Sequence, residues 1–293
     1  MMHYKFVHRT ICQYDSPVNV CHYHAKLTPR CLPQQDCPWH ELHIDPVPLY
    51  RGMRFDAFGN AVTYLEIEGA HDRLEIVSRG LVQLAIGEVI DATATTRWEL
   101  LRDACRSPLW STAAMASAWT CRSPLIHPSS EMREYAMRSF HPGRPVLDAA
   151  LELNHRIFQD FVFDPEATHV ATPIHESWRK RRGVCQDFAQ VMIACLRSIG
   201  LPARYVSGYL ETLPPPGQTK LMGADASHAW LSLWCGEDCG WVDLDPTNDL
   251  MPSHRHITLA WGRDFSDVSP LRGVTLGAGN QKMSVAVDVI PTT

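Results

Sequence analysis

Polar and apolar residues alternate in several short segments near the start of the chain. These segments cover residues 3–8, 39–44, 61–67 and 74–84. Runs of turn-forming residues separate them, at 15–17, 58–60 and 68–72. Alternation with a period of two is typical of strands that bury one face, and turn residues between such strands reverse the chain. We therefore expect residues 1–90 to form an antiparallel β-rich domain, as one sheet or a small sandwich.

The apolar pattern changes to helical spacing in the middle of the chain. The clearest helix covers residues 188–199, where apolar residues recur three and four positions apart. Gly200 and Pro202 end it, because glycine adopts the conformation of a helix C-terminus and proline cannot continue a helix. Further helices are expected at 146–163, 98–105 and 131–140. Residues 91–140 therefore form a linker with short helices.

Strand patterns return after the clearest helix. They cover residues 203–210, 228–234, 241–245 and 284–290. A proline-rich loop is expected at 213–217, and a turn is expected at 235–240. Because helices and strands follow one another in separate blocks, the pattern predicts an α+β fold for residues 141–293, with a β extension at the C-terminus.

The composition is that of an ordinary globular protein. Of 293 residues, 45% are apolar and 20% are charged, and the net charge is -5. This balance indicates no basic surface, so we expect no nucleic-acid partner. No window approaches about 18 consecutive apolar residues, and the first residues resemble a strand rather than a signal peptide. We therefore expect no membrane span and a cytoplasmic location, with the ten cysteines as free thiols.

One cysteine, Cys185, lies where the clearest helix begins. Gly183 precedes it and is expected to make a tight turn with a positive φ angle. The free N–H groups and the positive end of the helix dipole stabilise a thiolate at such a position. A basic run at 179–182 precedes the cysteine, and Asp187 follows it and is expected to hold the local loop. Cys185 is therefore a candidate nucleophile, and a buried structural thiol is the alternative.

Two predicted strands flank the turn at 235–240 and bring a histidine close to a carboxylate. The register of this hairpin places Trp230 opposite Asp245. His228 is two residues from Trp230, so it shares the same face and lies diagonal to Asp245. In such an arrangement a carboxylate fixes the tautomer of a histidine. Asp243 lies one pair further away and is the weaker candidate, and a surface hairpin with outward polar residues is the alternative.

Two groups of residues resemble metal sites only in part. His40 and His43 lie one residue short of the spacing that points two helical histidines at one zinc ion, and their segment is strand-like. A second group combines two thiols of the predicted turn with two later histidines: Cys235, Cys239, His254 and His256. No second cysteine pair at metal spacing lies nearby, so we keep a metal-binding protein only as an alternative function, ranked below the others.

Several motifs together resemble the bacterial transglutaminase-like superfamily. The runs Gly-Val-Cys-Gln-Asp-Phe-Ala at 183–189 and Gly-Leu-Pro-Ala-Arg-Tyr-Val-Ser-Gly-Tyr at 200–209 resemble its nucleophile helix and following strand. Ser-His-Ala-Trp at 227–230 resembles its histidine motif, and Gly-Trp-Val-Asp-Leu-Asp-Pro-Thr at 240–247 resembles its aspartate motif. The tail at 262–270 and the runs at 14–17 and 27–30 resemble the same subgroup and the β-domain often fused ahead of the core.

The resemblance implies a papain-like transglutaminase core at 141–293, preceded by the β-rich domain. It implies Cys185 as nucleophile, His228 as base and Asp245 as the residue that orients the base. Such a site acts on an amide or peptide bond through a thioester acyl-enzyme and needs no cofactor. Gln186 stands where the animal transglutaminases usually have tryptophan, which puts crosslinking activity in doubt.

Two questions of function stay open at the level of sequence. Either water or an amine could accept the acyl group, and we favour hydrolysis because no amine-binding tunnel can be inferred. The expected partner is a protein or peptide substrate. The N–H of Cys185 is the natural candidate for one oxyanion donor. A non-catalytic peptide-binding protein on the same fold is the alternative from another functional class.

Overall fold

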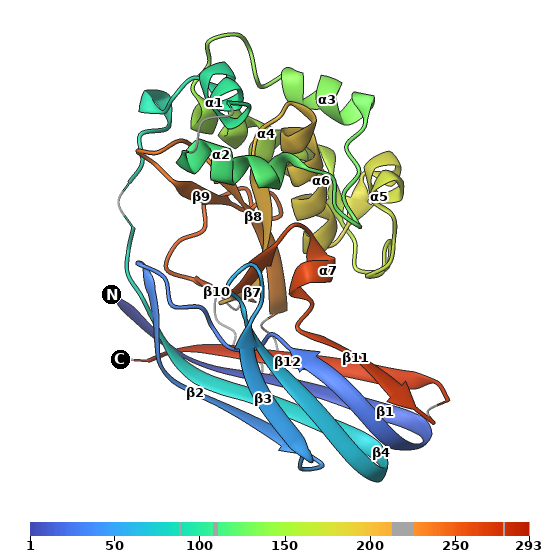
Figure 1. The fold of residues 1–293 in the computed structure, drawn as a ribbon. Coiled ribbons are helices and arrows are strands. Elements are labelled where there is room, and N and C mark those ends of the chain that lie inside the picture. The colour runs from blue at the N-terminus through green and yellow to red at the C-terminus, as the bar shows by residue number, and fades with distance from the viewer. Residues whose placement is uncertain (88, 108–110, 213–225, 278, 293) are drawn as a thin grey trace, which may run out of the picture.

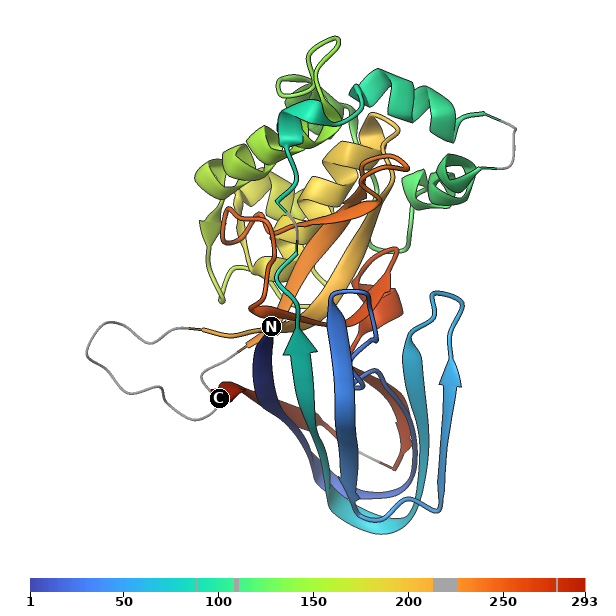
Figure 2. The same cartoon turned by 90° about the vertical axis from the view of Figure 1, so that its left-hand side faces the viewer.

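The computed structural model describes residues 1–292 apart from 88, 108–110, 213–225 and 278. The predicted loop at 213–217 lies outside the described residues. Figure 1 shows two layers of structure, a long curved sheet below and a helical part with its own sheet above. Both chain ends lie side by side where these two parts meet, and Figure 2 shows the same junction from the side. Among the described residues, no helix is long and apolar enough to cross a membrane.

The lower sheet has six antiparallel strands. β1 (Met2–Ala25) and β4 (Ala61–Leu84) pair along most of their length, which confirms the predicted antiparallel β-rich region. β2 (Gln35–Asp45) and β3 (Tyr50–Phe55) follow one another along the outer edge of β4. β11 (Leu271–Leu276) and β12 (Gln281–Thr292) follow one another along the outer edge of β1. The sheet is therefore completed by residues from the C-terminal end of the chain.

Two of the predicted turns do not reverse the chain. Residues 15–17 lie within β1 and residues 68–72 lie within β4, so the turn predictions at both places were wrong. The two segments face each other across the pair, and the register shifts there, between Gln13 and Val18 and again before Val20. Turn-forming residues thus make an irregularity in two long strands. The third predicted turn is present, with Gly59 at a φ of +73° between β3 and β4.

The upper part contains a four-stranded antiparallel sheet in the order β10-β7-β8-β9. Its strands are β7 (Ala203–Leu210), β8 (Ala226–Trp234), β9 (Trp241–Leu244) and β10 (His256–Gly262). Helix α6 (Cys185–Ser198) packs on one face through an almost wholly buried helix surface. Gly200, at a φ of +83°, ends α6 as predicted, and the N–H of Leu201 bonds to the carbonyl of Leu196 at 3.0 Å.

The remaining helices surround α6 and cover the upper sheet (Figure 1). They are α1 (Trp98–Cys105), α2 (Thr112–Ala116), α3 (Ser130–Met137), α4 (Val146–Asp160), α5 (Ile174–Lys180) and α7 (Phe265–Val268), with short 3-10 turns at Ala92–Ala94 and Ser117–Thr120. The sequence predicted α1 and, with shifted bounds, α3. It predicted that α4 continues to residue 163. The helix ends at Asp160 instead, because the chain leaves it there to pair β5 (Val162–Phe163) with β6 (Arg182–Gly183). The pattern missed α2, α5, α7, β5, β6 and β10 in the upper part, and β3 and β11 in the lower sheet.

Side-chain amides join the two parts along the free edge of β10. Gln35 of β2 donates to the carbonyl of Thr258 at 2.8 Å and accepts from its N–H at 2.7 Å. Asn60, beside β4, makes the same pair of bonds to Trp261, at 2.8 and 3.0 Å. These amides take the place of a neighbouring strand. The backbone N–H and carbonyl groups of Thr258 and Trp261, at the edge of β10, are therefore hydrogen-bonded.

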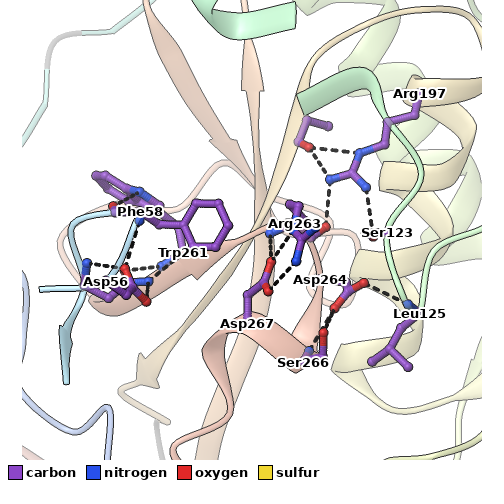
Figure 3. A network of polar contacts seen from close by, with 12 residues as sticks. Asp56, Phe58, Ser123, Leu125, Arg197, Trp261, Arg263, Asp264, Ser266 and Asp267 are labelled. Carbon is purple, nitrogen blue, oxygen red and sulfur yellow. Dashed lines mark hydrogen bonds and ion pairs between the residues drawn. The ribbon is translucent and has the colours of Figure 1, made fainter. Parts of the chain in front are cut away.

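A second polar network ties the segment after β10 to the helical part (Figure 3). The buried guanidinium of Arg197 donates to the carbonyl oxygens of Ala203 and Arg263, at 2.8 and 2.7 Å. Asp264, the N-cap of α7, accepts from the N–H of Leu125 at 2.8 Å and from that of Ser266 at 2.9 Å. The polar residues of the tail motif therefore hold the junction between sheet, helices and loop together.

Candidate active site

Cys185 is the first residue of α6, and its side chain is half-buried. Asp187 holds the chain that leads into the helix. Its Oδ1 accepts from the hydroxyl of Ser177 at 2.6 Å, and its Oδ2 accepts from the hydroxyl of Thr168 at 2.7 Å and from the N–H of Val184 at 2.9 Å. The start of the helix, and with it the thiol, is thus fixed by a buried carboxylate.

Gly183 has a different role from the one that its position suggested. The expected positive φ is absent, so that expectation was wrong. A Cβ atom at this position would lie 2.3 Å from Oδ2 of Asp187. The residue is therefore glycine because the carboxylate that holds the helix start packs directly against its backbone.

The basic run before the cysteine is directed toward other groups. Lys180 Nζ lies 2.6 Å from Glu176, and the Arg181 guanidinium lies 3.6 Å from the ring centroid of Trp178. Arg182 forms a longer ion pair with an aspartate that follows β5. These three basic side chains are therefore engaged with groups other than Cys185.

The hairpin of β8 and β9 has the predicted register. Trp234 pairs with Trp241, and the strands continue in step to Leu231 and Leu244. His228 and Asp245 lie diagonally on one face, and His228 Nε2 is 2.7 Å from Asp245 Oδ2. This face is buried rather than exposed, with His228 at 7% and Asp245 at 0% exposure, so the surface-hairpin alternative was wrong.

The two residues form a charged pair. Burial alone would lower the pKa of His228, but hydrogen bonds and charge interactions with Asp245 and Cys185 raise it to about 10. Burial alone would raise the pKa of Asp245, yet hydrogen bonds from His228, His256 and Asn248 hold it well below its usual range. Because Nε2 of His228 faces Asp245, Nδ1 is the ring nitrogen left to interact with the Cys185 thiol. The imidazolium form is therefore favoured at neutral pH.

Asp243 is occupied elsewhere on the same face. It accepts from Trp230 Nε1 at 2.9 Å and from the Ser232 hydroxyl. Trp230 is fully buried and its ring stacks beside His228, with the ring centroids 6.0 Å apart. Asp243 therefore fixes Trp230, the neighbour of His228, rather than His228 itself. This agrees with the sequence analysis, in which Asp243 is the weaker candidate for orienting His228.

Two further side chains contact Asp245 that the sequence did not single out for this place. Asn248 Nδ2 lies 2.7 Å from Asp245 Oδ2 and 3.3 Å from His228 Nε2. His256 Nε2 lies 3.2 Å from the same oxygen. Asn248 follows Asp245 by three positions in a turn, which is a usable sequence signal. His256 arrives from β10, and no local pattern reveals that contact.

Neither of the two groups that resemble metal sites in part assembles among the described residues. Among the described residues, the only group of three close potential ligands is His228, Asp245 and His256, with ligand atoms within 4.8 Å of one another. Both histidine nitrogens lie at hydrogen-bonding distance from one carboxylate oxygen, so hydrogen bonds account for this group. Cys235 and Cys239 are free thiols, and His40 bonds to Ser78.

Comparison with known proteins places the chain in a family. Residues 4–83 match the bacterial transglutaminase-like N-terminal region, and residues 133–246 match the transglutaminase-like superfamily. The chain is 38% identical to an uncharacterized protein of Mycobacterium tuberculosis, over 98% of this chain and 92% of that protein. The chain therefore belongs to the transglutaminase-like superfamily, as its motifs predicted.

Two other similarities bear on the fold and on the core. The solved structure of a provisionally assigned cysteine protease from Cytophaga hutchinsonii has a TM-score of 0.80 at 19% identity and covers 100% of this chain and 91% of that one. This likeness shows the fold, an α+β core with an antiparallel β region ahead of it. A shorter stretch is 34% identical to a protein-glutamine gamma-glutamyltransferase of Pseudomonas aeruginosa, over 40% of this chain and 18% of that protein.

Proposed function

We propose that the protein is a cysteine-nucleophile enzyme that acts on amide or peptide bonds of a protein or peptide substrate. The observation that carries the proposal is the meeting of three groups. A thiol at a helix N-terminus lies beside an imidazole, and a fully buried carboxylate holds that imidazole at 2.7 Å. This is the arrangement that activates a thiol for attack on a carbonyl carbon, and it needs no cofactor.

In the first half of the reaction, the Cys185 thiolate attacks the carbonyl carbon while His228 is imidazolium. The N–H of Cys185 at the start of α6 is one donor to the oxyanion. When the tetrahedral intermediate collapses, the C–N bond breaks and the leaving amine takes the proton of His228. The product is a thioester on Cys185, with neutral His228 still bonded to Asp245.

In the second half, neutral His228 takes a proton from the acceptor that attacks the thioester, and the thiolate leaves. Water as the acceptor makes the protein a peptidase or amidase. A primary amine makes it a transglutaminase, and the similarity of the core to the Pseudomonas aeruginosa transferase favours keeping this second candidate. We propose hydrolysis as the main reaction, with Gln186 in place of the tryptophan of animal transglutaminases as the supporting feature.

The first test measures how fast each cysteine reacts with iodoacetamide at neutral pH, by peptide mass mapping. Accessibility alone predicts that the exposed thiols of Cys31 and Cys121 react faster than half-buried Cys185. The proposal predicts the opposite order, because only Cys185 combines a helix N-terminus with an imidazolium partner. If Cys185 labels more slowly than Cys31 and Cys121 in the folded protein, the nucleophile assignment is refuted.

The second test identifies the acceptor. A peptide library is incubated with the wild-type protein and with Cys185→Ala, with and without a primary amine, and the products are read by mass spectrometry. Hydrolysis gives cleaved or deamidated peptides that are unaffected by the amine, whereas transamidation gives amine adducts. Absence of both products with the wild-type protein, despite a reactive Cys185, would favour the non-catalytic peptide-binding alternative.

We further propose that the protein acts in the cytoplasm. The support is chemical: all ten cysteines are free thiols, and five of them are buried in the two cores. Proteins of reducing compartments keep their cysteines in this state.

A further inference from the structure

The Asp245 carboxylate accepts hydrogen bonds from three side chains at one oxygen. His228 Nε2 and Asn248 Nδ2 each lie 2.7 Å from Oδ2, and His256 Nε2 lies 3.2 Å from it. His256 is the first residue of β10, and β7 separates that strand from β8 and His228. The His256 side chain is 3% exposed. Two histidines from two strands therefore share one buried carboxylate, and the mechanism above uses only one of them.

The His256 ring is held in a defined orientation. The Trp230 ring packs edge-to-face against it, with the ring centroids 5.2 Å apart, and Asp243 fixes Trp230 in turn. Nδ1 of His256 has no hydrogen-bond partner among the described residues. Burial lowers the pKa of His256, against the opposing effect of Asp245, so the neutral ring is favoured. A neutral ring that faces a carboxylate through Nε2 carries its proton on that nitrogen.

We propose that His256 is a positioning residue, whose Nε2–H holds the Asp245 carboxylate in the orientation from which Oδ2 accepts the hydrogen bond of His228. The inference rests on the proposed function, because Asp245 acts through His228. The other oxygen, Oδ1, is held by the backbone N–H groups of Thr247 and Asn248, at 2.9 and 3.2 Å. Removing His256 leaves Oδ1 anchored but takes away the support of Oδ2 from β10. His228 can then adopt a wider range of orientations toward Cys185.

A metal ion is the other chemistry that these ligand atoms could serve, since they lie within 4.8 Å of one another. A zinc ion there would have to replace the 2.7 Å bond between His228 and Asp245, because zinc–ligand bonds need both groups to turn toward the ion. Asn248 would also lose its acceptor. In the hydrogen-bonded arrangement, Oδ2 already has three hydrogen-bond donors without an ion. The experiment below includes a chelator, which distinguishes the hydrogen-bonded arrangement from a metal site.

The test uses the full-length protein and measures the rate of Cys185 alkylation by iodoacetamide, from mildly acidic to mildly alkaline pH. His256→Phe keeps an aromatic ring against Trp230 but removes the donor, whereas His256→Gln keeps an N–H group at similar reach. His8→Phe is the matched control. His8 is also a buried histidine, at 1% exposure, and its ring lies 5.5 Å from that of Tyr209, but no contact joins it to Asp245.

We expect His256→Phe to slow Cys185 alkylation at neutral pH by about tenfold or more, the effect of one hydrogen bond to a charged group. Its pH profile should also shift, because the thiolate–imidazolium pair is less well held. His256→Gln should restore the rate to within about threefold of wild type, and His8→Phe should leave it unchanged. With a substrate identified, His256→Phe should lower kcat and leave KM nearly unchanged.

Three outcomes would overturn the proposal. The first is a folded His256→Phe protein that labels Cys185 at the wild-type rate at every pH. The second is a His256→Gln protein as slow as His256→Phe, which would indicate a purely steric role. The third is a change in the wild-type rate on adding a chelator, which would assign the cluster to a metal ion. If His256→Phe proves unfolded in a thermal melt, His256→Asn, whose amide is too short to reach Asp245, replaces it. Slow labelling of wild-type Cys185 itself would refute the proposed function instead.

Discussion

Two aspartates of one strand end, two positions apart, have different partners. Asp245 accepts from His228 at 2.7 Å, whereas Asp243 accepts from Trp230 at 2.9 Å. Both side chains share the face that carries the site, although Asp243 is partly exposed and Asp245 is fully buried, and charge alone does not separate their roles. The hydrogen-bond partners do, and the same substitution at both positions therefore tests the assignment at the scale of single residues.

Asp245→Asn should lower turnover by about 10⁴-fold, because asparagine keeps the shape but cannot stabilise the imidazolium of His228. The pKa of His228, raised to about 10 in the wild-type protein, should fall, since burial then acts against the charged form with less opposition. Asp243→Asn should be milder and should mainly lower the melting temperature through Trp230. Both variants are assayed beside Cys185→Ala on one substrate. Loss of turnover in Asp243→Asn with normal turnover in Asp245→Asn would show that the orienting residue is misassigned.

At the scale of elements, the start of α6 depends on a close contact between Gly183 and Asp187. In Gly183→Ala, the new Cβ would lie 2.3 Å from Asp187 Oδ2, so the carboxylate must move away from Val184 and Thr168. We expect the free energy of unfolding to fall by about 1–3 kcal/mol, as for other overpacked sites. Cys185 alkylation should also slow, because the helix N-terminus is less well fixed. Gly87→Ala, where nothing lies within 4 Å of the added Cβ, is the control. Equal stability and equal alkylation rates in the two variants would contradict this account.

At the scale of the whole molecule, β12 belongs to both parts at once. It pairs with β1 from residue 3 to residue 14, while its Val287 and Val289 pack against Tyr209 and Ile257 of the upper sheet. β12 thus contacts the upper sheet, although its strand pairing is with β1 of the N-terminal sheet. The domain limits at residues 90 and 140 stay predictions, since one sheet contains both ends of the chain.

Val289→Ala should therefore lower the free energy of unfolding by about 2 kcal/mol, because it removes fully buried methyl groups from the cluster that joins both parts. Val285→Ala, in the same strand but 50% exposed, should change it by less than about 0.5 kcal/mol. Chemical denaturation followed by circular dichroism measures both. Two separate unfolding transitions, with only the first shifted by Val289→Ala, would show that the two parts fold independently.

The sequence by itself determined the features whose partners lie close together along the chain. The hairpin of β8 and β9 is set by its short turn and its alternation, so the pairing of Trp234 with Trp241 and the approach of His228 to Asp245 followed from counting residues. Helix α6, which begins at Cys185 and is terminated by Gly200 just after Ser198, followed from its spacing and its glycine. Local propensity and local geometry are sufficient for such features.

Only the tertiary structure decided which distant segments meet. The pairing of β12 with β1, and the arrival of His256 at Asp245 from another strand, depend on free strand edges and on burial that no local pattern encodes. The same reason explains the corrections: residues 15–17 and 68–72 have turn composition, but pairing along two long strands outweighs it. Position 183 likewise requires glycine because the Asp187 carboxylate packs against its backbone, and not because of its φ angle. Long-range pairing and packing carry more free energy than local propensity, so they override it where the two conflict.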